Sequence, residues 1–512
     1  MLREFRSLLA EKGKKELPNV LLVAAECAPL SKTGGLADVV GTLPSSLQAL
    51  GVDARVITPY HRCIKEKYAA QVEHMFYIYV DLGWRHEYAG IEKLELNGTI
   101  IYLVDSEFYF GDKIYRGGNA EGEQYAFFVR AVLDAMPKLD FTPDIVHCND
   151  WHTAMIPMLA RTQYKGSCQE EMKYLISIHN IAFQGKYGFD FVKDLLGVAD
   201  QYNTPEFMEL YGCADYLKAA CVFSDRISTV SPTYAEEIKT PYYSEGLDGI
   251  LNARSAQLSG ILNGIDIKTF NAAKDKLIPA RFTTENLSGK AKCKSALQKK
   301  MGLNEDADVP VIAMVTRMTE QKGFELVMQE LDRLMNSQRV QFVLLGTGDS
   351  RYECFMRSAE ERYKGRLAAY IGYNEALAHL VYAGSDFFLM PSRFEPCGLS
   401  QMISMRYGTL PIVRETGGLK DSVIPYNQYT DEGDGFSFAE FNSRDMYNAI
   451  CYALSFYPDK KVMSGLITRA MEKEFSFKRS AIAYVELYIS MLDDKPAETR
   501  NKKKRTAGKA ES

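Results

Sequence analysis

Lys-Thr-Gly-Gly-Leu-Ala-Asp, residues 32–38, is one of two Gly-Gly turns that decide the fold of this 512-residue chain. The second, Glu-Thr-Gly-Gly-Leu-Lys-Asp, is residues 415–421, near the other end. Each turn follows a strand-like apolar run and leads into a helix-like segment. Backbone N–H groups in such a turn approach an anion closely, and a helix N-terminus adds favourable partial charge. The two turns therefore predict two α/β domains that face each other across a cleft, where a phosphate-bearing ligand binds.

Short apolar runs alternate with helix-like segments, such as 121–138, along most of the chain. In the first half we expect strands at 19–25, 54–58, 100–104, 144–147, 174–178, 226–230 and 258–262. In the second half we expect them at 309–315, 340–345, 367–371, 387–390 and 410–413. Strand–helix alternation at this spacing predicts parallel sheets with helices on both faces.

The alternation pauses once in the middle of the chain, which predicts two large α/β domains joined by a polar stretch. The predicted segments are an N-terminal extension (1–17), a first α/β domain (18–262), a linker region (263–308), a second α/β domain (309–475), a terminal helix (476–492) and a disordered basic tail (493–512).

The composition argues against several classes of protein. A net charge of −5 disfavours a broad basic surface for nucleic acid. No run approaches 18 consecutive apolar residues, so we expect no membrane-spanning helix. The ten Cys contain no Cys-x-x-Cys pair, which disfavours structural zinc, and reduced thiols in a cytosol fit best. Residues 1–17 lack an apolar signal core, so we expect a cytoplasmic protein.

Aromatic side chains are abundant, with 31 Tyr and 26 Phe against 2 Trp. Exposed Tyr and Phe commonly stack on sugars, whereas core packing accounts for most aromatic residues in a globular protein. The composition is therefore compatible with a sugar ligand but does not by itself indicate one.

Two cations, Arg317 and Lys322, follow the expected strand 309–315. An Arg forks onto a diphosphate and a Lys supplies a point charge, so the pair could neutralise a leaving diphosphate without metal. The alternative is a solvated loop that carries two surface cations.

Glu395 follows the expected strand 387–390 and precedes Pro396, which restricts the backbone of Glu395 to extended conformations. A carboxylate held in this way suits a sugar hydroxyl or an oxocarbenium-like charge. The alternative is a structural carboxylate that caps the next helix.

His179 ends the strand 174–178 and could hydrogen-bond a sugar hydroxyl. Asp150 and Trp151 end the strand 144–147, where the alternatives are that Asp150 caps the following helix and that Trp151 belongs to the core. Several other signatures are missing, namely Gly-x-Gly-x-x-Gly after the first strand, a phosphate-binding Gly-x4-Gly-Lys-Ser/Thr loop and a Gly-x-Ser-x-Gly elbow. We assign no metal site, including at Asp431 and Asp434.

Seven motifs together closely resemble those of bacterial glycogen synthases and plant starch synthases, in order from about residue 19 to 490. They are Lys32-Thr-Gly-Gly-Leu-Ala-Asp-Val-Val, Asn149-Asp-Trp-His, His179-Asn-Ile-Ala-Phe-Gln-Gly, Asn263-Gly-Ile-Asp, Arg317…Gln321-Lys-Gly, Ser392-Arg-Phe-Glu-Pro-Cys-Gly-Leu and Thr416-Gly-Gly-Leu. The resemblance implies an α/β fold of the GT-B class, with two Rossmann-like domains and a deep cleft between them. It implies transfer of glucose from a nucleotide-glucose, usually ADP-glucose, to the non-reducing end of an α-1,4-glucan such as glycogen.

The implied transfer retains the anomeric configuration and needs neither metal nor cofactor, and the implied partners include no nucleic acid and no membrane. The resemblance leaves the oligomeric state open. The implied catalytic residues are His179, which would bind the donor glucose, Arg317 and Lys322, which would hold the diphosphate, and Glu395, which would lie by the transferring sugar.

The resemblance also implies a set of donor-binding residues. Lys32 and the Gly34-Gly35 turn would contact the donor from the first domain, which is also the acceptor side, and Asp38 would lie near the nucleoside. The remaining donor-binding residues are Asn263 and, as a source of backbone N–H groups, Thr416, Gly417 and Gly418. One departure is Asn149, where many bacterial relatives carry His, and the acceptor contacts stay open.

We expect same-face substitution assisted by the leaving diphosphate, because no sequence-specific nucleophile is evident. Four alternatives remain at this point. They are a UDP-glucose-using transferase, a transferase that makes a small sugar such as sucrose or trehalose, an α-glucan phosphorylase with a pyridoxal phosphate lysine, and a non-catalytic glucan-binding or initiation protein.

Overall fold

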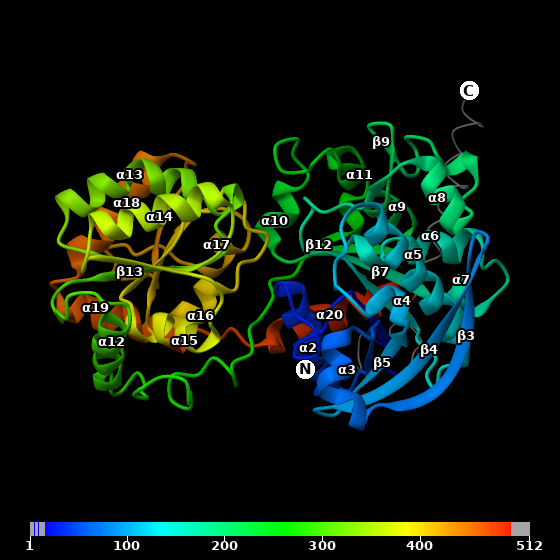
Figure 1. Ribbon diagram of the computed structural model, residues 1–512, viewed down its shortest axis with the longest axis horizontal. Coiled ribbons are helices and arrows are strands. Elements are labelled where there is room, and N and C mark those ends of the chain that lie inside the picture. Colours follow the sequence, from blue (N-terminus) through cyan, green and yellow to red (C-terminus); the bar gives the residue numbers. More distant parts are fainter. Residues whose placement is uncertain (1–4, 6–8, 10–15, 493–512) are drawn as a thin grey trace. The chain divides into compact units, whose positions relative to one another are not determined.

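The computed structural model describes residues 5, 9 and 16–492 (Figure 1). The predicted N-terminal extension (1–17) is therefore described only in small part, and the predicted basic tail (493–512) lies outside the described residues. Two compact units are present. The described residues of Met1–Val230, Ala235–Gly264 and Phe477–Ser512 form the first, and Ser231–Tyr234 with Ile265–Ser476 form the second.

A nine-stranded sheet in the order β12-β11-β7-β6-β1-β2-β5-β4-β3 forms the centre of the first unit. Its first seven strands pair in parallel and coincide with the seven predicted strands. They are β12 (Leu258–Gly260), β11 (Arg226–Thr229), β7 (Lys173–Ile178), β6 (Ile145–Asn149), β1 (Val20–Val23), β2 (Ala54–Pro59) and β5 (Thr99–Asp105). Strands covered on both faces consist of nearly continuous apolar runs, and the four residues of β1 are all buried.

The last two strands form a long antiparallel hairpin that the sequence did not predict. β3 (Glu73–Leu82) pairs with β4 (Arg85–Leu96), and β4 pairs with β5. Ile78, Val80 and Leu82 are buried, whereas the residues between them are exposed. One face of the hairpin is therefore open to solvent, and its alternating pattern contains no continuous apolar run. A small second sheet joins β8 (Lys186–Tyr187), β10 (Cys213–Asp215) and β9 (Glu209–Leu210).

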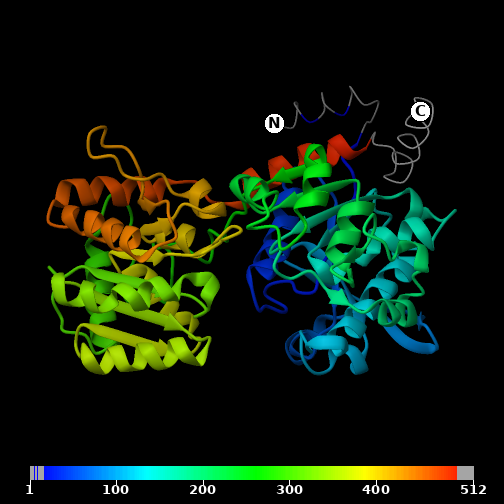
Figure 2. The same cartoon turned by 90° about the horizontal axis from the view of Figure 1, so that it is seen from above.

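Helices from distant parts of the chain cover the first sheet. The main ones are α2 (Gly35–Gln48), α5 (Gly118–Ala135), α6 (Met155–Thr162), α9 (Tyr216–Phe223) and α20 (Phe477–Met491). The chain returns to the first unit at α20, which packs beside α2 and appears in red in Figure 2. There the hydroxyl of Tyr488 lies 2.8 Å from Nδ1 of His147 on β6. The C-terminal helix therefore completes the core around the first strands.

The second unit contains a six-stranded parallel sheet in the order β15-β14-β13-β16-β17-β18. Its strands are β15 (Leu367–Ile371), β14 (Gln341–Gly346), β13 (Val311–Val315), β16 (Phe387–Met390), β17 (Leu410–Arg414) and β18 (Phe436–Phe438), of which all but β18 were predicted.

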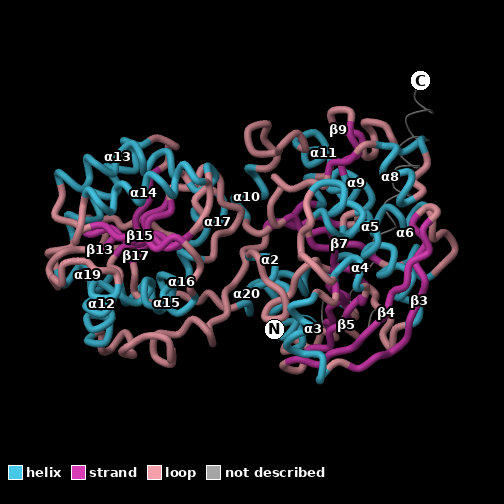
Figure 3. The backbone as a smooth tube through the Cα atoms, in the orientation of Figure 1, coloured by secondary structure: helices cyan, strands magenta, loops and turns pink. Residues whose placement is uncertain are grey.

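Helices cover both faces of the second sheet (Figures 1 and 3). One face carries α13 (Phe324–Ser337), α14 (Ser350–Arg362) and α18 (Ser443–Phe456). The other carries α12 (Ser288–Lys300), α15 (Glu375–Gly384), α16 (Ser400–Arg406) and α19 (Lys460–Glu472). The expected linker region (263–308) is part of this unit from residue 265 onward, where α12 packs against α15. Among the helices that the structure describes, none combines the length and hydropathy needed to cross a membrane.

Candidate active site

The first Gly-Gly turn leaves open space at the start of α2. Gly34 is the N-cap residue of this helix, with an extended backbone at φ −153°. A Cβ built on Gly34 would meet no atom within 4 Å, so packing inside the protein does not require a glycine there. Lys32 is exposed and Asp38 is partly buried, and the two pair through Nζ and Oδ1 at 2.7 Å. The structure thus brings Lys32, Gly34 and Asp38 together around an unfilled helix N-terminus.

Glu26 anchors this turn, although the sequence analysis did not single it out. Its carboxylate accepts hydrogen bonds from the backbone N–H of Thr33, from the Thr33 hydroxyl at 2.9 Å and from the Tyr115 hydroxyl at 2.7 Å. Glu26 is only 3% exposed. A lone acidic residue three positions after a strand is a weak signal, and its partner Tyr115 lies 89 residues away. Glu26 therefore fixes the shape of the turn that carries Lys32.

His179 lies at the end of β7 with a defined tautomer. The Nδ2 group of Asn149 donates to the backbone carbonyls of Val23 at 3.1 Å and His147 at 3.0 Å. The Oδ1 atom of Asn149 must therefore accept from Nε2 of His179, 2.9 Å away. Burial lowers the pKa of His179 to about 4, so the ring is neutral at pH 7. Its Nδ1 atom is then unprotonated and can accept a hydrogen bond from a hydroxyl.

Asp150 orders the end of β7 rather than the following helix. Its Oδ1 atom accepts from the backbone N–H groups of His179 at 2.7 Å and Asn180 at 3.4 Å, and it makes no capping bond. The alternative that Asp150 caps the next helix is therefore wrong, whereas Trp151 is buried as a core residue. Burial raises the pKa of Asp150 to about 7, against the lowering effect of these N–H bonds, and the charge of Glu26 adds to the rise.

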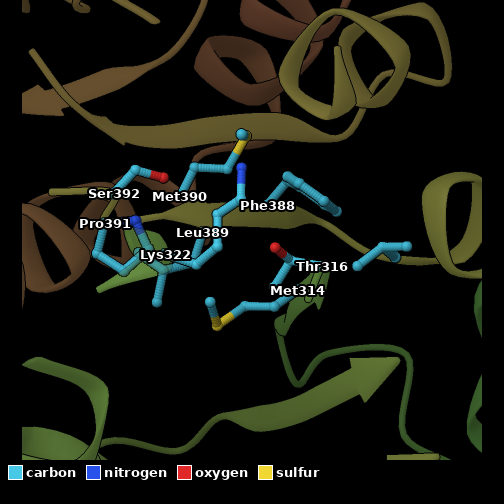
Figure 4. A pocket seen from close by; sticks show the side chains of 9 residues that line it. Met314, Thr316, Lys322, Phe388, Leu389, Met390, Pro391 and Ser392 are labelled. Atoms are coloured by element: carbon cyan, nitrogen blue, oxygen red, sulfur yellow. The ribbon is translucent and has the colours of Figure 1, made fainter. Parts of the chain in front are cut away.

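Lys322 and Glu395 meet at the carboxyl ends of β13 and β16 in the second unit. The Lys322 Nζ atom lies 2.6 Å from Oε2 of Glu395, which also accepts from the Ser392 hydroxyl at 3.0 Å. Glu395 is 5% exposed. Figure 4 shows Lys322 beside Pro391 and Ser392 in a pocket that also includes Met314 and Thr316. Because its carboxylate bonds to Lys322 and Ser392, Glu395 does not cap the next helix, and Lys322 is not a solvated cation.

The second Gly-Gly turn holds the backbone of Glu395. Gly417 has φ +44°, and a Cβ at this position would overlap the carbonyl oxygen of Glu395. The N–H of Gly418 donates to that carbonyl at 3.1 Å, and the N–H of Thr416 donates to Arg414 O at 2.9 Å. The N–H groups of Thr416 and Gly418, which we expected to contact a ligand, are thus already bonded within the protein. The glycines of this turn permit a close backbone approach.

Arg317 and Asn263 have side-chain groups that meet no partner among the residues that the structure describes. Arg317 is exposed just after β13, and no acidic side chain among the described residues pairs with it. Asn263 is buried, and its Oδ1 atom receives no hydrogen bond from the described part of the chain. A buried acceptor without a partner is costly unless a ligand or water supplies a donor. Each group can therefore bind a ligand without first breaking a contact in its own unit.

Comparison with known proteins identifies the family of this chain. Residues 19–253 match the family described as "Starch synthase catalytic domain", and residues 297–464 match "Glycosyl transferases group 1". The glycogen synthase of Geobacillus thermodenitrificans is 48% identical over 474 residues, which cover 92% of this chain and 98% of the relative. The chain belongs to the glycogen and starch synthase family. The glycogen synthase of Lachnospira eligens is 47% identical over 479 residues, 93% of this chain and 100% of the relative.

Solved structures show that this family member has the GT-B fold of glycosyltransferases. The catalytic domain of starch synthase IV from Arabidopsis thaliana, bound to ADP and acarbose, matches with a TM-score of 0.86 at 31% identity. That match covers 94% of this chain and 100% of the starch synthase chain. Sucrose-phosphate synthase from Thermosynechococcus elongatus, with a TM-score of 0.59 and 16% identity, shares the fold alone.

Proposed function

We propose that this glycosyltransferase is a glycogen synthase that transfers glucose from ADP-glucose to the non-reducing end of an α-1,4-glucan with retention of configuration. The observation that carries the proposal is the ion pair between the partly buried Lys322 and the buried Glu395, which joins a cation and a carboxylate at one end of a parallel sheet. The names of the curated relatives support the glucan product. The ADP and acarbose bound to the Arabidopsis starch synthase support an adenine nucleotide and a glucan-like acceptor.

The cations of the second unit would stabilise the leaving diphosphate. The Lys322 ammonium has three N–H donors, of which one bonds to Glu395, so a phosphate oxygen can accept another. The exposed guanidinium of Arg317 would supply a planar, forked donor to the same diphosphate. Charge that develops on the leaving group is thereby neutralised in the transition state, which lowers the barrier to transfer.

The first unit would bind the glucose. The unprotonated Nδ1 atom of His179 would accept a bond from a sugar hydroxyl, and Asn149 keeps that tautomer in place. The open turn at Lys32 and Gly34 would receive the donor, with Asp38 exchanging its bond to Lys32 for one to the nucleoside. Asn263 would use its unpartnered Oδ1 atom on the same ligand.

Retention would follow from attack on the same face as the leaving group. A double-displacement route needs a carboxylate that is free to attack the anomeric carbon. The oxygens of Glu26 accept bonds from Thr33 and Tyr115, Oδ1 of Asp150 accepts from two backbone N–H groups, and Glu395 is paired with Lys322. These three carboxylates therefore favour same-face substitution assisted by the diphosphate.

The test is nucleotide release by the full-length protein supplied with ADP-glucose or UDP-glucose, with and without glycogen. We expect glycogen-dependent release of ADP. Replacing Lys322 with Ala should lower kcat by roughly a hundredfold or more, because it removes charge stabilisation that acts in the transition state. Lys364→Ala, at an exposed position in the same unit, is the matched control and should leave kcat unchanged.

Other outcomes would change or overturn the proposal. Release of UDP in place of ADP would keep the reaction class and change the donor. No release with either sugar nucleotide would indicate a binding or initiation role. Full activity of a folded Lys322→Ala variant would remove Lys322 from the mechanism.

A further inference from the structure

The outer face of the β3–β4 hairpin carries a cluster of exposed aromatic rings. Tyr77 and Tyr79 on β3 are 58% and 53% exposed, and Tyr88 on β4 is 45% exposed. Because side chains alternate along a strand, these rings lie on the face opposite to the buried side chains of Ile78 and Val80. Core packing therefore does not account for them. Exposed apolar patches of this kind mark binding surfaces.

The rings hold one another in place. Tyr79 lies directly across from Tyr88 in the sheet, and Asp81 lies across from His86. The Tyr77 and Tyr88 rings stack with centroids 5.8 Å apart, and the Tyr79 ring stacks on His86 at 4.7 Å. Strand pairing and ring stacking thus present a pre-organised surface. We call Tyr77, Tyr79, His86 and Tyr88 the tyrosine face.

Polar groups border the tyrosine face. Asp81 bonds to Nδ1 of His86 at 2.6 Å, and Glu92 bonds to Nδ1 of His74 at 2.9 Å. Gly90, opposite Tyr77, has no side chain, and the Tyr88 hydroxyl and the Glu92 carboxylate lie over it. Flat rings beside carboxylates, imidazoles and phenols are the chemistry that recognises a neutral sugar. The rings cover its C–H face, and the polar groups bond to its hydroxyls.

The charges on this face disfavour other ligands. Asp81 and Glu92 would repel the phosphates of a nucleic acid or an anionic lipid. The large exposed apolar side chains of the hairpin are all aromatic, namely the three tyrosine rings and Trp84, which is 80% exposed at the turn between the two strands. A neutral polyhydroxylated polymer matches both the rings and the paired acidic groups.

The tyrosine face is separate from the candidate active site. β3 lies at the edge of the first sheet (Figure 1), and the sheet order places it four strands from β1. At about 4.8 Å per strand, this separation is roughly 19 Å across the sheet. Sugar units bound there are therefore not the units that react at His179.

We propose that the tyrosine face is a second binding site for an α-glucan chain, which holds the polymer near the enzyme while its chain ends react elsewhere. This inference rests on the proposed function for the identity of the polymer. Holding a branched polymer at a second site raises the local concentration of its chain ends without any new contact at the active site. The second site should therefore increase the affinity for long acceptors, whereas the affinity for an acceptor too short to span both sites should not change.

The experiment measures glycogen affinity by electrophoresis of the full-length protein through gels that contain glycogen, in the absence of any sugar nucleotide. The triple variant Tyr77→Ala, Tyr79→Ala, Tyr88→Ala should bind glycogen roughly tenfold more weakly than the unaltered protein, since it loses the stacking surface. Its KM for glycogen should rise by a similar factor, while kcat and KM for maltotriose stay unchanged.

Tyr429→Ala is the matched control, because Tyr429 is 89% exposed and its ring has no partner among the described residues. It should bind glycogen like the unaltered protein. Tyr77→Phe, Tyr79→Phe, Tyr88→Phe keeps the rings and should retain most of the affinity, which separates loss of stacking from loss of fold. If the triple Ala variant unfolds in the same transition as the unaltered protein, its hairpin is correctly folded.

The outcomes distinguish this site from the proposed function. If the protein releases no nucleotide but glycogen affinity depends on the three rings, the tyrosine face stands and the proposed function falls. If ADP release is normal and the folded triple Ala variant binds glycogen unchanged, the tyrosine face is overturned. A change from dimer to monomer with unchanged glycogen binding would assign this face to a contact between copies and would also overturn it.

Discussion

The two Gly-Gly turns have nearly the same sequence and different physical roles. Gly34 in the first turn has an extended backbone and open space where a side chain would be. Gly417 in the second has φ +44° and lies against the carbonyl of Glu395. In the first turn, the absence of a side chain leaves open space at Gly34. In the second turn, it allows the backbone at Gly417 to contact the backbone carbonyl of Glu395, which holds Glu395 in place.

The difference shows that a shared motif does not imply a shared contact. Both turns suggested N–H groups that bind a phosphate. In the second turn the Thr416 and Gly418 N–H groups donate to protein carbonyls. This turn therefore contributes to the site by positioning Glu395. A side chain added at each turn should therefore have different consequences for stability and activity.

Gly417→Ala should have the largest effect. An Ala at this position adopts an unfavourable backbone conformation and overlaps the Glu395 carbonyl. We expect a loss of roughly 3 kcal/mol in the free energy of unfolding of the second unit, with activity reduced by about a hundredfold or more. Both tryptophans, Trp84 and Trp151, lie in the first unit, so their fluorescence reports on that unit separately.

Urea unfolding should then show an earlier transition by circular dichroism and an unchanged one by tryptophan fluorescence. Equal shifts of both signals would mean that the two units unfold together. Wild-type stability and activity in the Ala variant would contradict the role assigned to the second turn.

Acid should weaken the first unit before the second. Burial lowers the pKa values of four histidines in the first unit to between about 3 and 4, with the charge of His179 also acting on His147. They are His61, His147, His152 and His179. Below pH 6.5 the unfolded chain takes up protons that the folded unit does not, so stability falls as the pH falls toward 4 and is fully present above 6.5.

Two buried acids oppose this effect. Burial raises the pKa values of Asp150 and Asp215 to about 7, so in the folded state they bind protons over the same range. Because four histidines lower the stability and two acids raise it, the free energy of unfolding of the first unit should fall by roughly 2 kcal/mol between pH 7 and pH 5. Urea unfolding followed by tryptophan fluorescence measures this change. A midpoint that does not move between these pH values would refute the imbalance.

The sequence predicted the parts of the fold that are covered on both faces. Buried parallel strands such as β1 and β13 are continuous apolar runs, so their positions follow from composition alone. The β3–β4 hairpin was missed because one of its faces is exposed and its pattern alternates. The site residues beside strand ends were named, but their pairings were not. Lys322 and Glu395 lie 73 residues apart, and only folding brings them together.

Gly34→Ala should have the smallest effect on stability and so provides the sharpest contrast with Gly417. Its backbone suits an Ala, and the added Cβ meets no atom within 4 Å, so the free energy of unfolding should change by no more than about 1 kcal/mol. The methyl group instead occupies the space in which we propose that the donor binds. KM for ADP-glucose should rise roughly tenfold, because a ligand that approaches the backbone closely is displaced.

Steady-state kinetics beside urea unfolding separates the two effects. A variant with normal stability and weakened donor binding supports the distinction between an open turn and a backbone clamp. A variant with normal stability and normal KM would mean that the donor does not approach Gly34. A strongly destabilised variant would mean that the space at Gly34 is needed for folding, and the two turns would then share one role after all.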